Sequence, residues 1–330
     1  MSSPVHWQSR GPLAVLLLPV AALFASIAVL RRLAWRSGLL HPRQTGIPVI
    51  VVGNITAGGT GKTPLVLWLA QFLSENGRHP GIISRGYGAA RSDPRAVPAD
   101  GAAADYGDEP CLLARRAGCP VWVGTDRAAT ALALHSAHPE VDVIISDDGL
   151  QHYRLARDFE IAVIDGARGL GNGWPLPSGP LREPASRLES VDAVVINGAA
   201  TTAWRRSIAM RLEGNSFRNL RDAQRVVQPE YFSGQRVHAV AGIGNPQRFF
   251  GHLRQLGLDC ATHVFPDHHP YVEADLRFGD ADEVVMTEKD AVKCEAFATT
   301  GHWALVVNAG IDPELGEQIL ARLAQAKRNG

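Results

Sequence analysis

A glycine-rich stretch that ends in lysine and threonine is the segment best suited to chemistry. Residues 56–63 read Thr-Ala-Gly-Gly-Thr-Gly-Lys-Thr, which fits the phosphate-binding P-loop pattern except that Thr56 replaces its first glycine. The glycines let backbone N–H groups turn toward phosphate oxygens, Lys62 carries a charge for the β- and γ-phosphates, and the Thr63 hydroxyl suits Mg²⁺. The expected nucleotide-binding residues are Thr56, Ala57, Gly58, Gly59, Thr60, Gly61, Lys62 and Thr63.

Two adjacent aspartates follow an apolar run at residues 141–145, where a P-loop enzyme needs a carboxylate for its metal ion. Asp147 and Asp148 are therefore expected to hold Mg²⁺ together with Thr63. The alternative is a turn that merely begins with Asp-Asp-Gly. His152, a little further on, could orient a phosphate or cap this turn, and the sequence leaves both open.

A second acidic pair, Asp108 and Glu109, stands directly before Pro110. Proline favours the first turn of a helix, so these acids are expected near a helix N-terminus, where they could act only as charged caps. The functional interpretation is a base for a substrate hydroxyl, with help in holding the metal. Asp267-His268-His269 lacks the further ligands of a metal site, but a histidine there could tune such a base from the other domain.

Arginines occur in Gly- and Pro-rich loops that follow predicted strands, which is where doubly wound sheets bind ligands. Arg85 lies in residues 84–88, and Arg182 with Glu183 lies in residues 179–183. These arginines could hold a substrate phosphate or pair with surface acids. Residues 287–290, Thr-Glu-Lys-Asp, resemble the guanine-reading motif of GTPases, but their lysine is one place late, which favours ATP over GTP.

The elements that position these residues follow an α/β pattern. A buried strand at 47–52 leads into the glycine-rich loop and then into a helix at 64–76, which Asn76-Gly77 closes. Further apolar runs predict a parallel sheet buried on both faces, with strands at 81–83, 121–123, 141–145, 161–164 and 193–196. A helix is expected at 127–135, a second strand set at 238–241, 283–286 and 304–307, and an amphipathic helix at 313–326.

The predicted organisation is a P-loop NTPase-like parallel sheet flanked by helices, followed by a smaller α/β domain. We assign residues 1–40 to a membrane-associated helix, 41–208 to the P-loop core, 209–235 to a linker or hairpin, and 236–330 to the second domain.

Residues 13–30 are uncharged and interrupted by Pro19. Arg10 precedes them, while Arg31, Arg32 and Arg36 follow, which would keep the downstream chain in the cytoplasm. A membrane helix kinked at its proline, a buried core helix and a signal peptide are the three interpretations. The length is at the lower limit for a span, so crossing and embedding both remain open.

Composition excludes some classes of protein. The 330-residue chain has 33 basic and 33 acidic residues, so its formal net charge is zero. A general nucleic-acid binder would need a basic field, so we expect no nucleic-acid partner. The four cysteines form no Cys-x-x-Cys pair, which indicates reduced thiols rather than a disulfide framework.

Together these motifs resemble the tetraacyldisaccharide 4′-kinase family, the lipid A 4′-kinases of Gram-negative bacteria. The matching pieces occur in the family's order and cover the chain to about Lys293. They are residues 53–63, 84–88, 107–110, 147–152, 180–183, 267–268 and 287–293. The family's loop also begins with threonine, so Thr56 is no departure from it.

The resemblance implies transfer of the ATP γ-phosphoryl group to the 4′-hydroxyl of a tetraacylated glucosamine disaccharide 1-phosphate in lipid A biosynthesis. It implies Mg²⁺, a lipid substrate in the membrane, no obligate protein partner, and a site at the cytoplasmic face of the bacterial inner membrane. It makes Asp108 the base, His268 its partner and Lys62 the phosphoryl clamp. The implied metal set is Thr63, Asp147 and Asp148, with Glu109 as a further member, and we expect Arg85, His152, Arg182 and Glu183 to contact the substrate.

A membrane-tethered regulatory ATPase is the alternative function. It explains the phosphate loop and the N-terminal segment, but it explains the Asp108–Glu109 pair and the Asp267–His268 element less well. Since His268 belongs to the second domain, the kinase interpretation also predicts that the domains must close on ATP.

Overall fold

The computed structural model describes residues 4–87, 91–199, 204, 207–278 and 282–326. Its strands are β1 (Val49–Gly53), β2 (Pro80–Ser84), β3 (Arg95–Ala96), β4 (Val121–Val123), β5 (Val143–Ser146), β6 (Phe159–Asp165), β7 (Ala193–Asn197), β8 (Ser207–Asn219), β9 (Val226–Val227), β10 (Val237–Ala241), β11 (Cys260–Val264), β12 (Glu283–Thr287) and β13 (His302–Ile311). Its helices are α1 (Pro12–Leu16), α2 (Leu18–Arg36), α3 (Lys62–Glu75), α4 (Ala103–Tyr106), α5 (Asp108–Arg116), α6 (Arg127–Ala137), α7 (Pro246–Gln255), α8 (Glu288–Cys294) and α9 (Glu314–Ala326). Short 3₁₀ turns are η1 (Val5–Trp7), η2 (Ala185–Glu189), η3 (Pro229–Phe232), η4 (Glu273–Leu276) and η5 (Glu295–Phe297).

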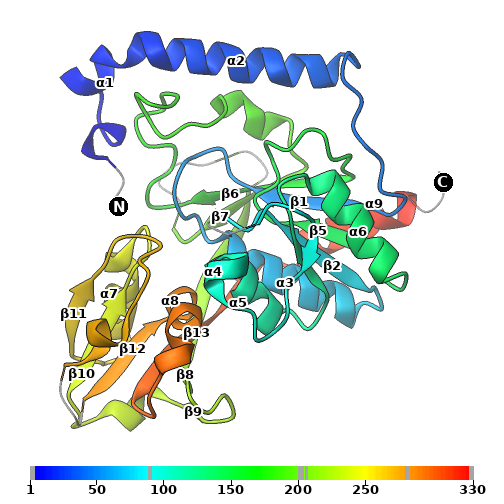
Figure 1. The fold of residues 1–330 in the computed structure, drawn as a ribbon. Coiled ribbons are helices and arrows are strands. Elements are labelled where there is room, and N and C mark those ends of the chain that lie inside the picture. The colour runs from blue at the N-terminus through cyan, green and yellow to red at the C-terminus, as the bar shows by residue number, and fades with distance from the viewer. Residues whose placement is uncertain (1–3, 88–90, 200–203, 205–206, 279–281, 327–330) are drawn as a thin grey trace.

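One continuous sheet runs through both halves of the molecule (Figure 1), in the order β11-β10-β12-β13-β8-β7-β6-β1-β5-β2-β4-β3, with β9 beside β8. In the core half, β2, β5, β1, β6 and β7 pair in parallel, as the continuous apolar runs predict. Parallel pairing puts the carboxyl ends of these strands at one edge, where the phosphate loop and Asp147 follow β1 and β5.

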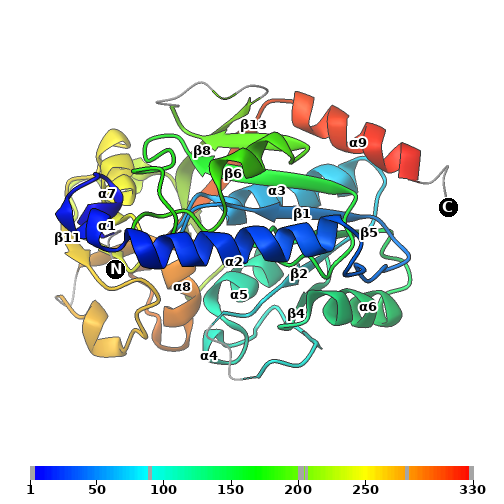
Figure 2. The ribbon, with the colours of Figure 1, turned by 90° about the horizontal axis from the view of Figure 1, so that it is seen from above.

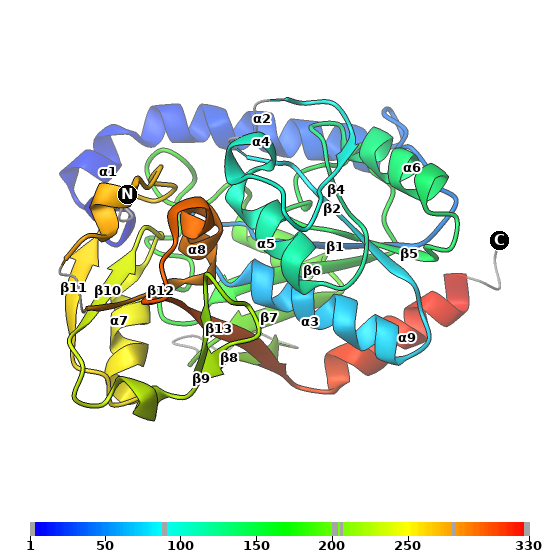
Figure 3. The same cartoon turned by 60° about the horizontal axis from the view of Figure 1, so that its bottom comes forward.

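Both faces of the core strands are buried, which requires helices on each side. Ile50 and Val52 of β1 face a cluster that includes α3, α5 and α9, whereas Val49 and Val51 face a cluster that includes α6. Figure 3 shows α3, α5 and α9 over one side of the core. The alternation along β1 therefore explains why this strand reads as wholly apolar.

The segment 209–235, predicted to be a linker or hairpin, contributes strands to the sheet, and its strands β8 and β9 pair antiparallel as in a hairpin. It contains most of β8, together with β9 and η3, and β8 pairs in parallel with β7 and antiparallel with β13. Buried residues such as Ile208 and Met210 alternate with exposed ones. That alternation is typical of a strand with one solvated face, and it made this segment look polar enough to be a linker.

The second half is smaller and also α/β. Strands β10, β11 and β12 pair in parallel, and β12 continues in parallel with β13. Helix α7 packs on this sheet through Phe249, Phe250 and Leu253. Helix α8 contributes Ala291 and Cys294 to a separate cluster. The strand β11 escaped prediction because its residues are mostly exposed at the sheet edge.

The N-terminal segment forms two helices, and Pro19 lies in the first turn of α2 rather than kinking a single helix. Helix α2 is long and apolar enough to cross a membrane, and 6% of its apolar window is buried. It runs across the top of the core (Figures 1 and 2). Trp7 Nε1 donates to the Pro177 carbonyl at 3.0 Å before the helix, and Arg32 donates to Ser190 Oγ at 2.6 Å near its end. Both ends are thus tied to the same side of the core.

Candidate active site

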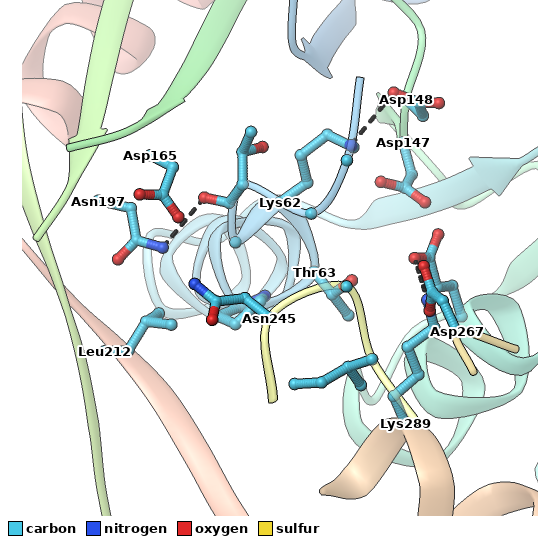
Figure 4. A pocket seen from close by; sticks show the side chains of 18 of the residues that line it. Lys62, Thr63, Asp147, Asp148, Asp165, Asn197, Leu212, Asn245, Asp267 and Lys289 are labelled. Atoms are coloured by element: carbon cyan, nitrogen blue, oxygen red, sulfur yellow. Dashed lines mark hydrogen bonds and ion pairs between the residues drawn. The ribbon is translucent and has the colours of Figure 1, made fainter. Parts of the chain in front are cut away.

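A cleft of about 1850 Å³ lies between the two halves. Its walls come from the phosphate loop, the ends of β5 to β7, α5 and α7, and the start of α8, with Phe24 and Ile27 of α2 at one border. Figure 4 shows polar side chains from both halves around this space. All the predicted site residues except Thr56 and Ala57 line the cleft.

The phosphate loop is held open by its own neighbours. Gly58 and Gly61 have φ of +99° and +90°, which only glycine adopts without strain. Asn54 Nδ2 donates to the Gly58 carbonyl at 3.2 Å, and Asn197 Nδ2 donates to the Thr60 carbonyl at 3.0 Å. These two bonds turn the carbonyls of Gly58 and Thr60 toward the protein, which suits a loop whose N–H groups and following helix start face an anion. Thr56, by contrast, forms a β-bridge with Leu181, and the Ala57 N–H donates to the Pro180 carbonyl at 2.8 Å, so the start of the loop is tied to this segment.

Asp148 is an ionised carboxylate between two cations. Burial disfavours its charged form, but Lys62 at 3.3 Å and Arg182 at 3.4 Å outweigh that effect and lower the pKa of Asp148 to about 2. Asp148 also has φ of +48°, which is uncommon for a non-glycine residue and concentrates at functional sites. The structure thus brings Lys62, Asp148 and Arg182 together as one charged group.

Asp147 is fully buried and lacks a full set of partners. Burial and the charges of Glu109 and Asp148 raise the pKa of Asp147 to about 7, although Lys62 and Arg127 oppose the shift. Ser84 Oγ donates to one carboxylate oxygen at 3.1 Å, while the buried Oδ1 has no hydrogen-bond partner. A bound cation would satisfy that oxygen and favour the ionised form, so the site fits a hard ion such as Mg²⁺.

The predicted fourth metal residue, Glu109, takes a different partner. Its carboxylate lies 3.2 Å from Lys289 Nζ. Among the residues that the structure describes, no group of three or more His, Cys, Asp or Glu side chains is arranged to hold a metal ion. The protein's share of a Mg²⁺ site would therefore be small, which is usual where nucleotide phosphates and water complete the shell.

Asp108 and His268 meet across the cleft, one from each half. His268 Nδ1 lies 2.9 Å from Asp108 Oδ2. Burial opposes ionisation of Asp108, but His268 and Lys289 more than compensate and hold its pKa below the usual value. The hydrogen bond to Asp108 raises the pKa of His268. His268 has φ of +60°, and the exposed ring of Tyr87 lies 5.3 Å from its ring centre.

The remaining predicted residues separate into two kinds. Arg85 is exposed and lines the cleft with His152, whose pKa falls to about 4 because of burial and the charges of Arg127 and Arg85. His152 is therefore neutral near pH 7. Glu183 is buried and accepts from Gln151 at 2.9 Å and from the Tyr153 hydroxyl, so its carboxylate is already occupied. Gly88, at the end of the Arg85 loop, lies outside the described residues.

Several site residues were missed from the sequence. Buried Arg127 donates to the Asp147 carbonyl at 2.8 Å. Arg248 of α7 donates to Asn197 at 2.8 Å and lies 3.3 Å from Asp165, across the cleft. Asp165 and Asn197 end buried strands, so the rule that found Asp147 could have found them too. Nothing local in the sequence marked Arg127 or Arg248.

Comparison with known proteins places this geometry in context. A family model described as tetraacyldisaccharide-1-P 4′-kinase matches residues 13–324. The tetraacyldisaccharide 4′-kinase of Azoarcus sp. is 52% identical over 330 residues, covering 99% of this chain and 96% of that protein. The protein of the same name from Methylobacillus flagellatus is 51% identical, covering 97% of this chain and 95% of its own length.

A solved structure is also similar. The "apo" form LpxK from Aquifex aeolicus, in complex with ATP, superimposes with a TM-score of 0.81 at 26% identity. The match covers 94% of this chain and 99% of the other. The shared architecture thus extends over both halves of the sheet.

Proposed function

The chain belongs to the tetraacyldisaccharide-1-P 4′-kinase family, and from this premise we propose that it transfers the γ-phosphoryl group of ATP to the 4′-hydroxyl of a tetraacylated glucosamine disaccharide 1-phosphate. The observation that carries the proposal is the meeting of a phosphate loop and the Asp108–His268 pair in one cleft. A regulatory ATPase has no need of a base aimed at an alcohol. The name of the relatives and the ATP in the similar solved structure favour the kinase over that alternative.

In this proposal the loop of residues 56–63 binds ATP, with Lys62 on the transferring phosphate. Asp147, Asp148 and Thr63 would hold Mg²⁺, which supplies charge neutralisation on the phosphate oxygens when bound. The buried, unpartnered oxygen of Asp147 supports this assignment. Glu109 remains a candidate for this set, with its present partner Lys289 as a competitor for the carboxylate.

The Asp108 carboxylate is proposed to accept the proton of the attacking hydroxyl, while His268 Nδ1 orients that carboxylate through its contact with Oδ2. The lowered pKa of Asp108 keeps it in the basic form near pH 7. Arg85 and Arg182 are proposed to receive the anionic part of the substrate, with neutral His152 as a hydrogen-bonding partner. Glu183, through Gln151 and Tyr153, is proposed to shape this wall rather than to touch the sugar.

We further propose that α2 lies in the plane of the inner membrane, on its cytoplasmic face. Leu23, Ile27 and Leu30 are exposed, and Trp7 before the helix and Arg32 near its end bind the same side of the core. A helix that crossed the bilayer would carry Trp7 to the opposite side and break its contact with Pro177. Because Phe24 and Ile27 border the cleft, acyl chains could stay in lipid while the sugar enters the site.

The test is direct. Detergent-solubilised protein is incubated with γ-labelled ATP, Mg²⁺ and a tetraacyldisaccharide 1-phosphate. Label on the lipid that disappears in Lys62→Ala is the expected result. ATP hydrolysis that is independent of lipid, with no labelled lipid, would return the regulatory ATPase as the better interpretation.

A further inference from the structure

The first turn of α8 carries charged residues that the proposed chemistry does not use. Lys289 lies on the same side of the cleft as Asp267 (Figure 4), and three carboxylates lie close to its Nζ. Its Nζ lies 3.2 Å from Glu109, 3.6 Å from Asp267 and 3.9 Å from Asp108. The lysine side chain is only 20% exposed, so these carboxylates share one partly desolvated ammonium group.

The three carboxylates come from both halves of the molecule. Asp108 and Glu109 begin α5 in the core, whereas Asp267 lies in the loop after β11. Like charges at such spacing repel one another, the more so where water is partly excluded. Lys289 supplies a positive charge at the place where these acids of the β11 loop and of α5 face one another.

The position of His268 depends on that approach. It directly follows Asp267, and its φ of +60° is a conformation that surrounding contacts must maintain. The ion pair of Lys289 with Asp267 fixes the loop one residue before His268, and the pairs with Asp108 and Glu109 fix the opposing acids. Lys289 therefore pairs with Asp108 on one side of the Asp108–His268 hydrogen bond and with Asp267, the residue before His268, on the other.

The preceding residue holds the other end of α5. Buried Glu288 accepts from Arg116 in the last turn of α5 and from the Val307 backbone N–H at 3.1 Å. Consecutive residues of α8 thus bind the first and the last turn of one core helix. This arrangement fixes the direction of α5 and places its N-terminal acids in register with Lys289.

We propose that Lys289 is a positioning residue for phosphoryl transfer, which gathers Asp108, Glu109 and Asp267 so that His268 docks on Asp108. The inference rests on the proposed roles of Asp108 and His268. Lys289 acts through these groups, so its loss disturbs the alignment of the base and leaves the phosphate loop intact.

The experiment compares Lys289→Met with Arg115→Met in the full-length enzyme. Arg115 forms another ion pair between α5 and the second half, with Glu295 at 3.1 Å, but it does not line the cleft. We expect Lys289→Met to lower kcat about 100-fold, the loss typical of a misplacement of about 1 Å. Its KM for ATP and the Kd for ATP measured by calorimetry should stay within about threefold of wild type, because the loop is untouched.

Arg115→Met should keep kcat within about threefold, since Arg115 pairs with Glu295 and the carbonyls of Ala99 and Gly101 and its loss leaves the acids around Lys289 in place. Lys289→Arg should recover at least about a tenth of the lost rate, because the charge is kept. Asp267→Asn should lower kcat as well, and the double variant Lys289→Met/Asp267→Asn should be no slower than Lys289→Met alone, as expected of residues that act as a unit.

Three results would overturn the inference. They are a kcat of Lys289→Met within threefold of wild type, an equal loss in Arg115→Met, or a loss of ATP affinity in Lys289→Met that parallels the loss of rate. If Lys289→Met fails to fold, the arginine and asparagine variants decide in its place. An Asp108→Asn control keeps the two proposals apart: full activity there refutes the assigned base, whereas a slow Asp108→Asn beside a fast Lys289→Met refutes only the role of Lys289.

Discussion

Gly61 is the residue at which the geometry of the phosphate loop can be tested most sharply. A Cβ added there would lie 2.3 Å from Asn197 Nδ2, the atom that donates to the Thr60 carbonyl. The residue also has φ of +90°. Alanine would therefore introduce backbone strain and displace Asn197 at the same time.

The magnitude follows from these two effects. A left-handed conformation costs an L-residue about 1–2 kcal/mol, and leaving a buried carbonyl without its donor costs about 1–3 kcal/mol. The two costs add to about 2–5 kcal/mol. The variant loop must overcome this free energy to adopt the shape that binds ATP. At about 1.4 kcal/mol per tenfold, ATP binding should weaken by roughly 30-fold to a few thousand-fold in Gly61→Ala.

Calorimetric titration of ATP measures this effect, with Gly77→Ala as the matched control. Gly77 follows the far end of α3 with φ of +71°, and a Cβ there meets nothing within 4 Å. That variant should lose stability to chemical denaturation while binding ATP as the wild type does. Adding Asn197→Ala to Gly61→Ala removes the clash, but it also removes the donor to the Thr60 carbonyl, so it should not restore ATP binding. ATP binding by Gly61→Ala within threefold of wild type would refute the reasoning.

Three further predictions concern the base, its partner and the membrane helix. Asp108→Asn should lower kcat by about 10²- to 10⁴-fold with the Kd for ATP nearly unchanged, whereas lost ATP binding would mark Asp108 as structural. His268→Asn, a residue type that tolerates positive φ, tests the pH dependence of stability. Because the pKa of His268 is raised in the folded state, its protonated form stabilises the fold below about pH 6.5. Because the pKa of Asp108 is lowered, its ionised form stabilises the fold above about pH 4. The deficit in Tm of the variant should thus be largest near pH 5–6 and shrink as pH rises toward 9, and a deficit that grows with pH would contradict the pairing. Deletion of residues 1–40 should reduce co-flotation with phospholipid vesicles by at least about tenfold, and unchanged flotation would rule out α2 as the main anchor.

The local pattern predicted the core well because its signals are short-range. Apolar runs matched β1, β5 and β7 to within one or two residues at most ends, and the glycine spacing identified the phosphate loop. Strands β8 and β11 were missed, whereas β1 is buried on both faces and forms a continuous apolar run. They are partly solvated, so their apolar residues are too few to stand out.

Long-range partners were harder to predict than elements. The Asp108–His268 pair was expected from the family resemblance, and the structure joins the two residues at 2.9 Å. The partners of Glu109 and Asn197 were not predicted. These contacts join residues that lie 180 and 137 positions apart in the chain, and no local periodicity carries such information.

The sharing of one sheet by both halves has a mechanical consequence. Strands β8 and β13 are hydrogen-bonded to each other from Met210–Ile311 to Asn219–Trp303, with one irregularity between Val306 and Asn308. No flexible tether separates the halves along this ribbon, so a change in their relative angle must bend or twist the paired strands. We expect such a connector to deform elastically, with a small displacement that is spread over many residues and opposed by a restoring force. Any opening and closing of the cleft during turnover is then elastic, and the irregularity at Val306–Asn308 is the place where the ribbon bends most easily.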